Sequence, residues 1–419
     1  MNRESLPDTA ALTGTNPLIA IQPEFKHMRR SMVITYEDHN MSNPRCALCN
    51  VEITGENDSQ EHIILNAIGG IRKVPQVFCV SCNSGAGAKW DAEAARQLQF
   101  LAVHIGVVRD RGIGRAVEVV TASGRRIRKQ PDGRLSFPAS KPSITPKGQG
   151  VEIRIQATTR AEAEKTLRGL KRKYPKLDVD AALAGVDERD TYLSEPVMAE
   201  LNFGGTLSGR SVVKSALTLA VSEGVDAHIC DLALRYLQNE NSDPPFGYYY
   251  RRDLVTNRPP NRIFHCVAVK GDPVTRKLNG YIELFSIYRM VIGLSDRYAG
   301  PAIAASYSID PTLGEELNLN VDLTFTDDEL RFAIANEEDY SPKLLEACDT
   351  VMGIAQQLSF EQELQRASAR AYKGAIAALG LIRGQQMTKE IALALSQEIT
   401  KRMIPFLNHH IVPQRHRNS

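Results

Sequence analysis

Residues 46–49 (CALC), 61–70 (EHIILNAIGG) and 79–83 (CVSCN) decide how the N-terminal part of this chain folds. Two cysteine pairs with the same two-residue gap bracket a Glu-His dipeptide, and an asparagine directly follows the second pair. A CxxC spacing lets both thiolates reach one tetrahedral zinc ion, so two such pairs predict a four-sulfur site. Because such a site leaves no open coordination position, we expect this zinc to organise the fold rather than to catalyse.

The cysteine usage of the whole chain supports metal binding over disulfides. The other cysteines, Cys230, Cys266 and Cys348, are scattered singly, and no charged-then-apolar leader precedes the pairs. In a chain without a secretion signal, paired CxxC motifs favour a metal site. The predicted ligands are Cys46, Cys49, Cys79 and Cys82.

The residues between the cysteine pairs predict a strand, a loop, a second strand and a helix. Glu61-His62 precedes the apolar pair Ile63-Ile64 and suits a strand edge. Gly69-Gly70 permits a tight reversal before Val77-Phe78. A helix is predicted to begin near Ser84 and to run past Leu98, because apolar residues recur there at helical spacing.

These combined motifs resemble the HNH endonucleases, most closely the branch with an EHIIP-type sequence and a CxxCN ending. The resemblance covers residues 46–91, where Gly87 and Asp91 follow the last motif. It implies a ββα-metal finger, and it implies hydrolysis of DNA phosphodiesters with a divalent ion.

The resemblance also implies roles for particular residues. His62 takes the place of the general base, which removes a proton from the attacking water. Asn83 and Glu61 take the places of the ligands of the catalytic ion. Oxygen ligands of this kind imply Mg²⁺ or Mn²⁺. Asp91 either helps to bind that ion or faces solvent.

The sequence departs from the family pattern at two places. Leu65 stands where the family usually has proline. The middle asparagine of the family name, which braces the loop behind the base, has no clear counterpart, and Asn66 and Gln76 are the two candidates. A catalytically inert zinc module that only binds nucleic acid is therefore one alternative, and an RNase with the same finger is another.

Charge is distributed unevenly along the chain. Between Arg96 and Lys176 there are 19 Lys and Arg against 6 Asp and Glu, a net charge of +13, whereas the whole chain carries +2. A basic block directly after the module favours a polyphosphate partner, and a solvated surface without a partner is the alternative. The residues predicted to contact nucleic acid are Arg109, Arg111, Arg125, Arg126, Arg128, Lys129, Lys171, Arg172 and Lys173.

Periodicity and composition predict an α+β protein: a zinc-bound finger, then a larger mixed α/β domain with a helical C-terminal part. The predicted divisions are a loosely ordered segment 1–42, the module 43–105, a basic α/β region 106–200, a mixed α/β to helical domain 201–405 and a tail 406–419. In the basic region we predict a hairpin over 117–128, a linker at 138–150, a strand at 151–155 and a helix at 160–174. In the domain after it we predict two helices at 206–240, separated near Glu223-Gly224, and strands at 263–269 and 281–292. The C-terminal part is predicted to contain helices at 341–403, broken near Leu358 and Gly384. His265-Cys266 is predicted to be core.

Several functional classes find no support in the sequence. Gly204-Gly205 and Gly209 do not match a phosphate-binding loop, because no Lys-Ser or Lys-Thr follows at the proper distance. No apolar stretch approaches the length that spans a bilayer, so a cytoplasmic location without a membrane partner is expected. The predicted partners are DNA and other proteins, in a bacterial antiviral defence system or alternatively a mobile element, with the oligomeric state left open.

Overall fold

The computed structural model describes residues 44–410 apart from 113, 138–140, 149, 156, 158–159, 186–191, 194 and 338. The predicted loose segment 1–42 and residues 411–419 of the predicted tail lie outside the described residues. Among the helices that are described, none combines the length and the apolar character needed to cross a bilayer.

The cysteine module, residues 44–105, has the predicted element order, but its second strand lies before the predicted Val77-Phe78. Strand β1 (Glu61–His62) pairs antiparallel with β2 (Lys73–Val74), so that His62 stands opposite Lys73. Helix α1 (Val80–Ala86) continues through a π-helical turn (Gly87–Asp91) into α2 (Ala92–His104). The helix begins four residues before the predicted Ser84, because the second cysteine knuckle itself forms the first turn.

Glycines make the reversal between β1 and β2 possible. Gly69 has a φ of 98°, which lies in the left-handed region. A Cβ at Gly70 would lie 1.7 Å from the carbonyl oxygen of Ile64, so no other residue fits there. The reversal directs Ile64 and Ile68 into the core and leaves Glu61 and His62 on the strand beside it.

The basic region contains two small sheets. One has the order β5-β4-β3-β8, and the other pairs β6 with β7. The predicted hairpin is confirmed by β3 and β4, whereas the predicted linker is wrong in part, because residues 143–147 find a pairing partner in the next strand. The bounds are β3 (Val117–Thr121), β4 (Arg126–Lys129), β5 (Leu135–Ser136), β6 (Ser143–Lys147), β7 (Gly150–Arg154), α3 (Arg160–Lys171), α4 (Val179–Ala184) and β8 (Val197–Met198).

A six-stranded antiparallel sheet forms the centre of the C-terminal half, in the order β14-β13-β10-β11-β12-β9. The strand predicted over 281–292 is wrong, because two strands meet there in a tight turn. Phe285 and Ser286 both have φ near 57°, a conformation that glycine or asparagine would have signalled in the sequence. The bounds are β9 (Phe246–Tyr248), β10 (His265–Asp272), β11 (Lys277–Leu284), β12 (Tyr288–Ser295), β13 (Ile303–Asp310) and β14 (Glu315–Leu317).

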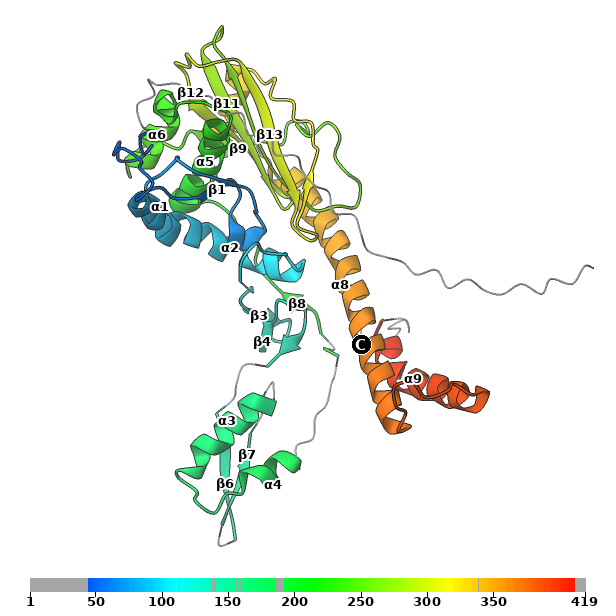
Figure 1. Ribbon diagram of the computed structural model, residues 1–419. Helices are drawn as coiled ribbons and strands as arrows, with labels where there is room; N and C mark the ends of the chain where they lie inside the picture. Colours follow the sequence, from blue (N-terminus) through cyan, green and yellow to red (C-terminus); the bar gives the residue numbers. More distant parts are fainter. Residues whose placement is uncertain are drawn as a thin grey trace, which may run out of the picture. The chain divides into compact units, whose positions relative to one another are not determined.

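Helix α5 joins the cysteine module to this sheet. The two helices predicted around Glu223-Gly224 are confirmed as α5 (Gly205–Ser222) and α6 (Asp231–Gln238), which lie against the sheet (Figure 1). Every residue of α5 from Ser208 to Ala220 is buried, because the module covers one side of the helix and the sheet covers another. Module, helix and sheet therefore share one hydrophobic core.

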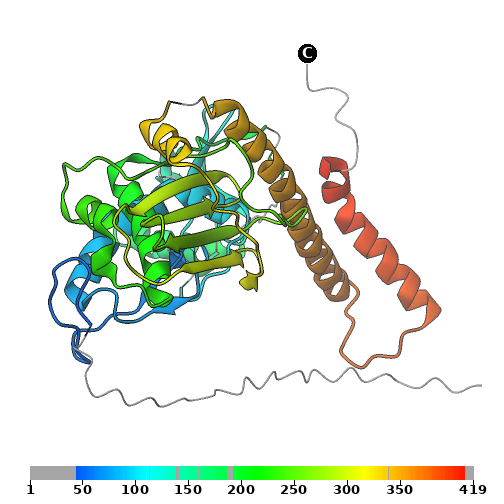
Figure 2. The same cartoon turned by 90° about the horizontal axis from the view of Figure 1, so that it is seen from above.

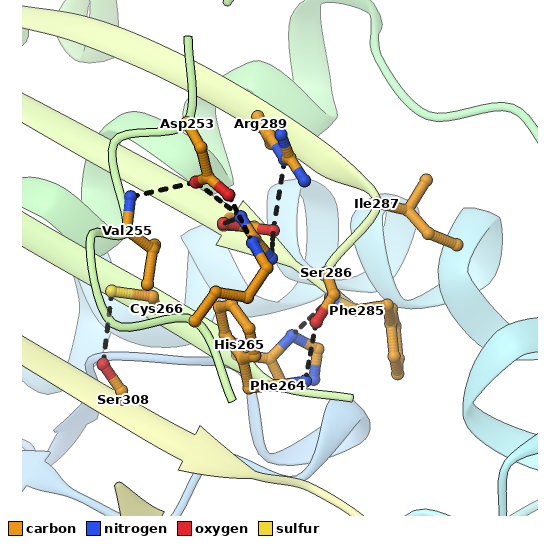
Figure 3. A network of polar contacts seen from close by, with 12 residues as sticks. Asp253, Val255, Phe264, His265, Cys266, Phe285, Ser286, Ile287, Arg289 and Ser308 are labelled. Carbon is orange, nitrogen blue, oxygen red and sulfur yellow. Dashed lines mark hydrogen bonds and ion pairs between the residues drawn. The ribbon is translucent and has the colours of Figure 1, made fainter. Parts of the chain in front are cut away.

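A buried histidine connects the module with the far side of the same core. His265 Nδ1 accepts a hydrogen bond from the backbone N–H of Phe285 at 3.0 Å, so its Nε2 carries the proton and donates to the Ile68 carbonyl at 2.9 Å. Figure 3 shows this ring beside Phe285 and Ser286. Complete burial lowers the pKa of His265 to about 3. The prediction that His265-Cys266 is core is confirmed, since both residues are fully buried.

The C-terminal part is helical: α7 (Asp327–Ala335), α8 (Ser341–Ala378) and α9 (Lys389–His410), of which the last two run side by side (Figure 2). The break predicted near Leu358 is wrong, because α8 continues through it and buries a row of alanines. The break near Gly384 is confirmed, and Gly380 and Gly384 both have positive φ there. Helix α9 extends to His410, beyond the start of the predicted tail.

Candidate active site and metal centre

The four predicted zinc ligands meet at one point. Their sulfur atoms all lie within 4.8 Å of one another, and the Sγ atoms of Cys49 and Cys79 are 3.7 Å apart. Tetrahedral zinc with Zn–S bonds near 2.3 Å places its sulfurs about 3.8 Å apart. The cluster therefore has the composition and the spacing of a structural zinc site. Its ligands are Cys46, Cys49, Cys79 and Cys82.

The electrostatics of the thiols also suit a bound cation. Burial opposes ionisation of Cys46, but backbone N–H groups of Cys79, Cys49 and Leu48 outweigh it and lower the pKa of Cys46 to about 7. Burial and the neighbouring thiols raise the pKa of Cys82. Four thiolates at this spacing repel one another unless a cation neutralises them, which is what zinc does in such sites.

His62, Glu61 and Asn83 line a single cavity of about 340 Å³, together with Asp91 and Arg111. Strand β1 supplies the first two residues and the first helical turns supply Asn83 and Asp91. The predicted base and the predicted ligands of the catalytic ion are thus brought together, and the four-cysteine cluster joins both ends of the segment that carries them.

His62 is held in its neutral form beside a carboxylate. Its Nε2 lies 3.7 Å from Oδ2 of Asp110, too far for a hydrogen bond, and this buried atom has no hydrogen-bond partner among the described residues. Lys73 holds the same carboxylate at 2.6 Å. Burial, assisted by Lys73 and Arg111, lowers the pKa of His62, whereas Asp110 opposes this shift. A neutral imidazole is the form that accepts a proton.

Glu61 is buried and is bound by a lysine from outside the module. Lys214 Nζ, on α5, donates to Oε1 of Glu61 at 2.5 Å, and the lysine side chain is fully buried. Burial alone lowers the pKa of Lys214, but Asp91 and Glu61 outweigh it and raise it, so the side chain is an ammonium. Burial raises the pKa of Glu61, and Lys214 counteracts that shift.

Both carboxylate oxygens of Asp91 are engaged by α5. Oδ2 accepts from Lys214 Nζ at 2.5 Å, and Oδ1 accepts from the Ser211 hydroxyl at 2.7 Å. The sequence left two roles open for Asp91, binding of the catalytic ion or exposure to solvent. Neither describes this arrangement, because both carboxylate oxygens accept hydrogen bonds from α5. Asp91 instead holds the lysine that holds Glu61.

Asn83 lies beside the Glu61 carboxylate. Its orientation is fixed by its Nδ2, which donates a hydrogen bond to the Ser59 hydroxyl at 3.1 Å. Ser59 in turn donates to the Phe78 carbonyl at 2.6 Å, next to the second cysteine pair. One carboxylate and one carboxamide are hard oxygen ligands of the kind that Mg²⁺ and Mn²⁺ prefer. The residues present therefore fit a hard divalent ion.

Asn66 braces the loop that covers His62. Its Oδ1 accepts from the backbone N–H groups of Asp110 and Arg111 at 3.1 and 3.4 Å, and its Nδ2 donates to the Arg111 carbonyl at 3.3 Å. Gln76, the other candidate for the missing asparagine, is exposed and accepts the left-handed φ of 64° at a turn.

The predicted nucleic-acid contacts are distributed over several elements. Arg111 is exposed at the cavity that contains His62, and Arg109 is half-buried nearby in the chain. Arg125, Arg126 and Arg128 are exposed on the β3–β4 hairpin, whereas Lys129 is only 7% exposed. Lys171, Arg172 and Lys173 are exposed where α3 ends. Contact of these residues with nucleic acid stays a prediction.

Two members of the site were not predicted from the sequence. Lys214 lies 153 residues after Glu61 in the largely buried helix α5, and Asp110 follows the module in the basic region. The lysine inside the run VVKSALTLA could have predicted this contact, because a charged residue within a buried helix requires a buried partner of opposite charge.

Comparison with known proteins gives one match. The HNH endonuclease family model matches residues 46–99. No curated protein matches the chain, and no solved structure does. The matched residues contain the four thiols and every module residue of the cavity, which supports a nuclease-type hydrolase with a nucleic-acid substrate. Residues 46–99 of this chain therefore match the HNH endonuclease family, and this segment is called the HNH domain below.

Proposed function

We propose that the chain is a metal-dependent endonuclease that hydrolyses DNA phosphodiester bonds. The observation that carries this proposal is the single cavity in which His62, Glu61 and Asn83 meet, next to a four-thiol cluster. The thiol cluster would hold Zn²⁺ as a structural ion, and Glu61 and Asn83 would hold Mg²⁺ or Mn²⁺. When bound, that second ion would supply Lewis-acid stabilisation of the charge that develops on the leaving oxygen.

The side chains of the cavity have separate roles in the proposed reaction. Neutral His62 removes a proton from the water that attacks phosphorus, which leaves a 5′ phosphate and a 3′ hydroxyl. Lys214 keeps the Glu61 carboxylate in place, and exposed Arg111 at the cavity mouth is available to a phosphate of the substrate. A single domain cuts one strand, so nicking is the unit event.

One observation favours the inert alternative: Lys214 already occupies an oxygen of Glu61. If this contact prevented ion binding, the domain would bind nucleic acid without cutting it. We favour catalysis because a carboxylate has two oxygens and its binding by a cation on one side leaves the other available. The cytoplasmic location and the role in antiviral defence with other proteins remain predictions.

The proposal is tested with a panel of substrates. Purified protein is incubated with supercoiled plasmid, linear duplex, single-stranded DNA and RNA, each with Mg²⁺, Mn²⁺ or EDTA. We expect nicked plasmid with Mn²⁺ or Mg²⁺ and none with EDTA. Cleavage of RNA alone would instead favour the RNase alternative. Binding without cleavage under every ion would support the inert module.

A further inference from the structure

A large cavity lies outside the HNH domain. It has a volume of about 700 Å³ and lies between the β3–β4–β5 sheet and helices α8 and α9. The lining residues include five Lys and Arg but one carboxylate, Glu363. A volume of this order accommodates a ligand of nucleotide size.

Most charged groups of this cavity are already paired. Arg366 and Arg370 both donate to Glu363, at 2.9 and 2.8 Å, and Arg134 donates to Asp132 at 2.7 Å. Tyr192 also donates its hydroxyl to Glu363, at 3.1 Å. The single carboxylate in the lining therefore already accepts hydrogen bonds from two arginines and a tyrosine. The lining offers no other carboxylate that could pair with a further cation.

Lys129 is the exception. Its side chain lines the cavity at 7% exposure, and the structure gives its ammonium no hydrogen bond or ion pair with any described residue. Burial and the nearby Arg366 lower the pKa of Lys129, with no anion acting in the opposite direction. An unpaired ammonium in a buried position costs free energy, so a lysine there is expected to serve a ligand.

A buried polar atom without a hydrogen-bond partner lies in the same lining. His104, the last residue of α2, has a buried Nδ1 that finds no partner among the described residues. Burial, assisted by the nearby Lys129, lowers the pKa of His104 to about 4. The imidazole is therefore neutral at neutral pH and can form a hydrogen bond with a ligand beside the Lys129 ammonium.

We infer that this cavity binds a small phosphate-bearing organic molecule, with Lys129 as the cation that contacts the phosphate. Phosphate oxygens satisfy both an unpaired ammonium and an imidazole. The aromatic residues Phe137 and Phe360 in the lining provide surface for an organic part. The Lys129 side chain as a whole is only 7% exposed, which favours a small molecule over a DNA duplex as the ligand. The inference is independent of the nuclease activity.

Thermal unfolding with small probes tests the inference. Inorganic phosphate, pyrophosphate and AMP are added at millimolar concentration to wild type and to Lys129→Met. We expect AMP and pyrophosphate to raise the Tm of the wild type, because a ligand that binds only the folded state stabilises it. In Lys129→Met the affinity measured by calorimetry should fall about tenfold or more. The unliganded variant should unfold at a higher temperature than wild type, since it no longer buries an unpaired charge.

The matched control is Arg128→Met, one residue away on the exposed side of β4. It should keep the probe-induced shift and leave the Tm of the unliganded protein nearly unchanged. The inference fails if no probe stabilises the wild type, or if Lys129→Met responds as the wild type does. It also fails if duplex DNA displaces AMP in competition, because the cavity would then belong to the DNA path.

A second measurement needs no variant and so covers the case in which Lys129→Met does not fold. Lysine acylation of the wild type is quantified by mass spectrometry with and without AMP. We expect AMP to reduce modification at Lys129 at least severalfold while Lys171, exposed on α3, is modified equally in both samples. Equal modification of Lys129 in both samples would overturn the inference.

Discussion

Lys214 Nζ lies 2.5 Å from Oε1 of Glu61, which joins the carboxylate of the HNH domain to a helix more than a hundred residues further along the chain. The same ammonium binds Asp91, whose other oxygen accepts from Ser211. The position of a proposed ion ligand therefore depends on α5 and on the sheet beneath that helix.

Replacement of Lys214 by methionine should weaken divalent-ion binding. Loss of a residue that orients a metal ligand typically costs about 10- to 100-fold in metal affinity. Breaking a buried ion pair by removing one partner also costs about 3–5 kcal/mol of unfolding free energy. Mn²⁺ affinity is measured by electron paramagnetic resonance, and stability by urea unfolding.

The control for this variant is Arg258→Met, which removes a cation from the fully buried Glu283, and neither residue lines the HNH cavity. It should lose stability and keep its Mn²⁺ affinity. A folded Lys214→Met protein that binds Mn²⁺ as tightly as wild type would show that the lysine has a purely structural role.

Zinc should be present at one ion per chain and should be required for the fold of residues 44–105. Cys79→Ser removes one of four thiols, and its zinc content by elemental analysis should fall well below that of wild type. Because structural zinc contributes about 10–16 kcal/mol of apparent binding free energy in small zinc domains, limited proteolysis should then cut within the module. Cys348→Ser, a half-buried single thiol on α8, should retain its zinc.

Asn66→Ala should slow cleavage because it releases the backbone of Asp110 and Arg111 above His62. These hydrogen bonds are exposed, so each contributes about 0.5–1.5 kcal/mol, and the loss of both predicts a rate reduction of about tenfold in plasmid nicking. Gln76→Ala, at the exposed turn, should cut at the wild-type rate. Equal rates for Asn66→Ala and Gln76→Ala would remove the bracing role from Asn66.

Stability should decrease in acid because His265 is buried in its neutral form. Its pKa is about 3 in the folded protein and 6.5 as an ordinary value, so between these pH values the unfolded chain binds a proton that the folded chain does not. Stability from this residue is complete above pH 6.5 and declines by about 1.4 kcal/mol per pH unit below it. Urea unfolding from pH 7 to 4 should show a smaller slope for His265→Gln than for wild type. An identical slope would contradict the burial argument.

Local patterns predicted the HNH domain well. The two CxxC pairs fix their own geometry, and His62 is held near Asn83 because the cysteine pairs join the segments that carry them. The antiparallel pairing of β1 and β2 follows from the Gly69-Gly70 reversal.

The features that could not be predicted depend on distant or unusual contacts. Lys214 meets Glu61 only because α5 packs between the module and the sheet. The turn at Phe285-Ser286 uses residues that rarely adopt positive φ, so the sequence pattern predicted a single strand through it. Because many basic residues surround Lys129 in the sequence, its side chain was predicted to be exposed and to contact nucleic acid. Tertiary packing instead buries that side chain.

The central claim is that His62 is the base of a nuclease site built on a zinc scaffold. Nicking of supercoiled plasmid with Mn²⁺ is measured for wild type, His62→Ala and His228→Ala, the last an exposed histidine outside the cavity, at equal zinc content. We expect His228→Ala to nick as wild type does and His62→Ala to lose at least about 100-fold in rate. Equal nicking by His62→Ala and His228→Ala would contradict the claim.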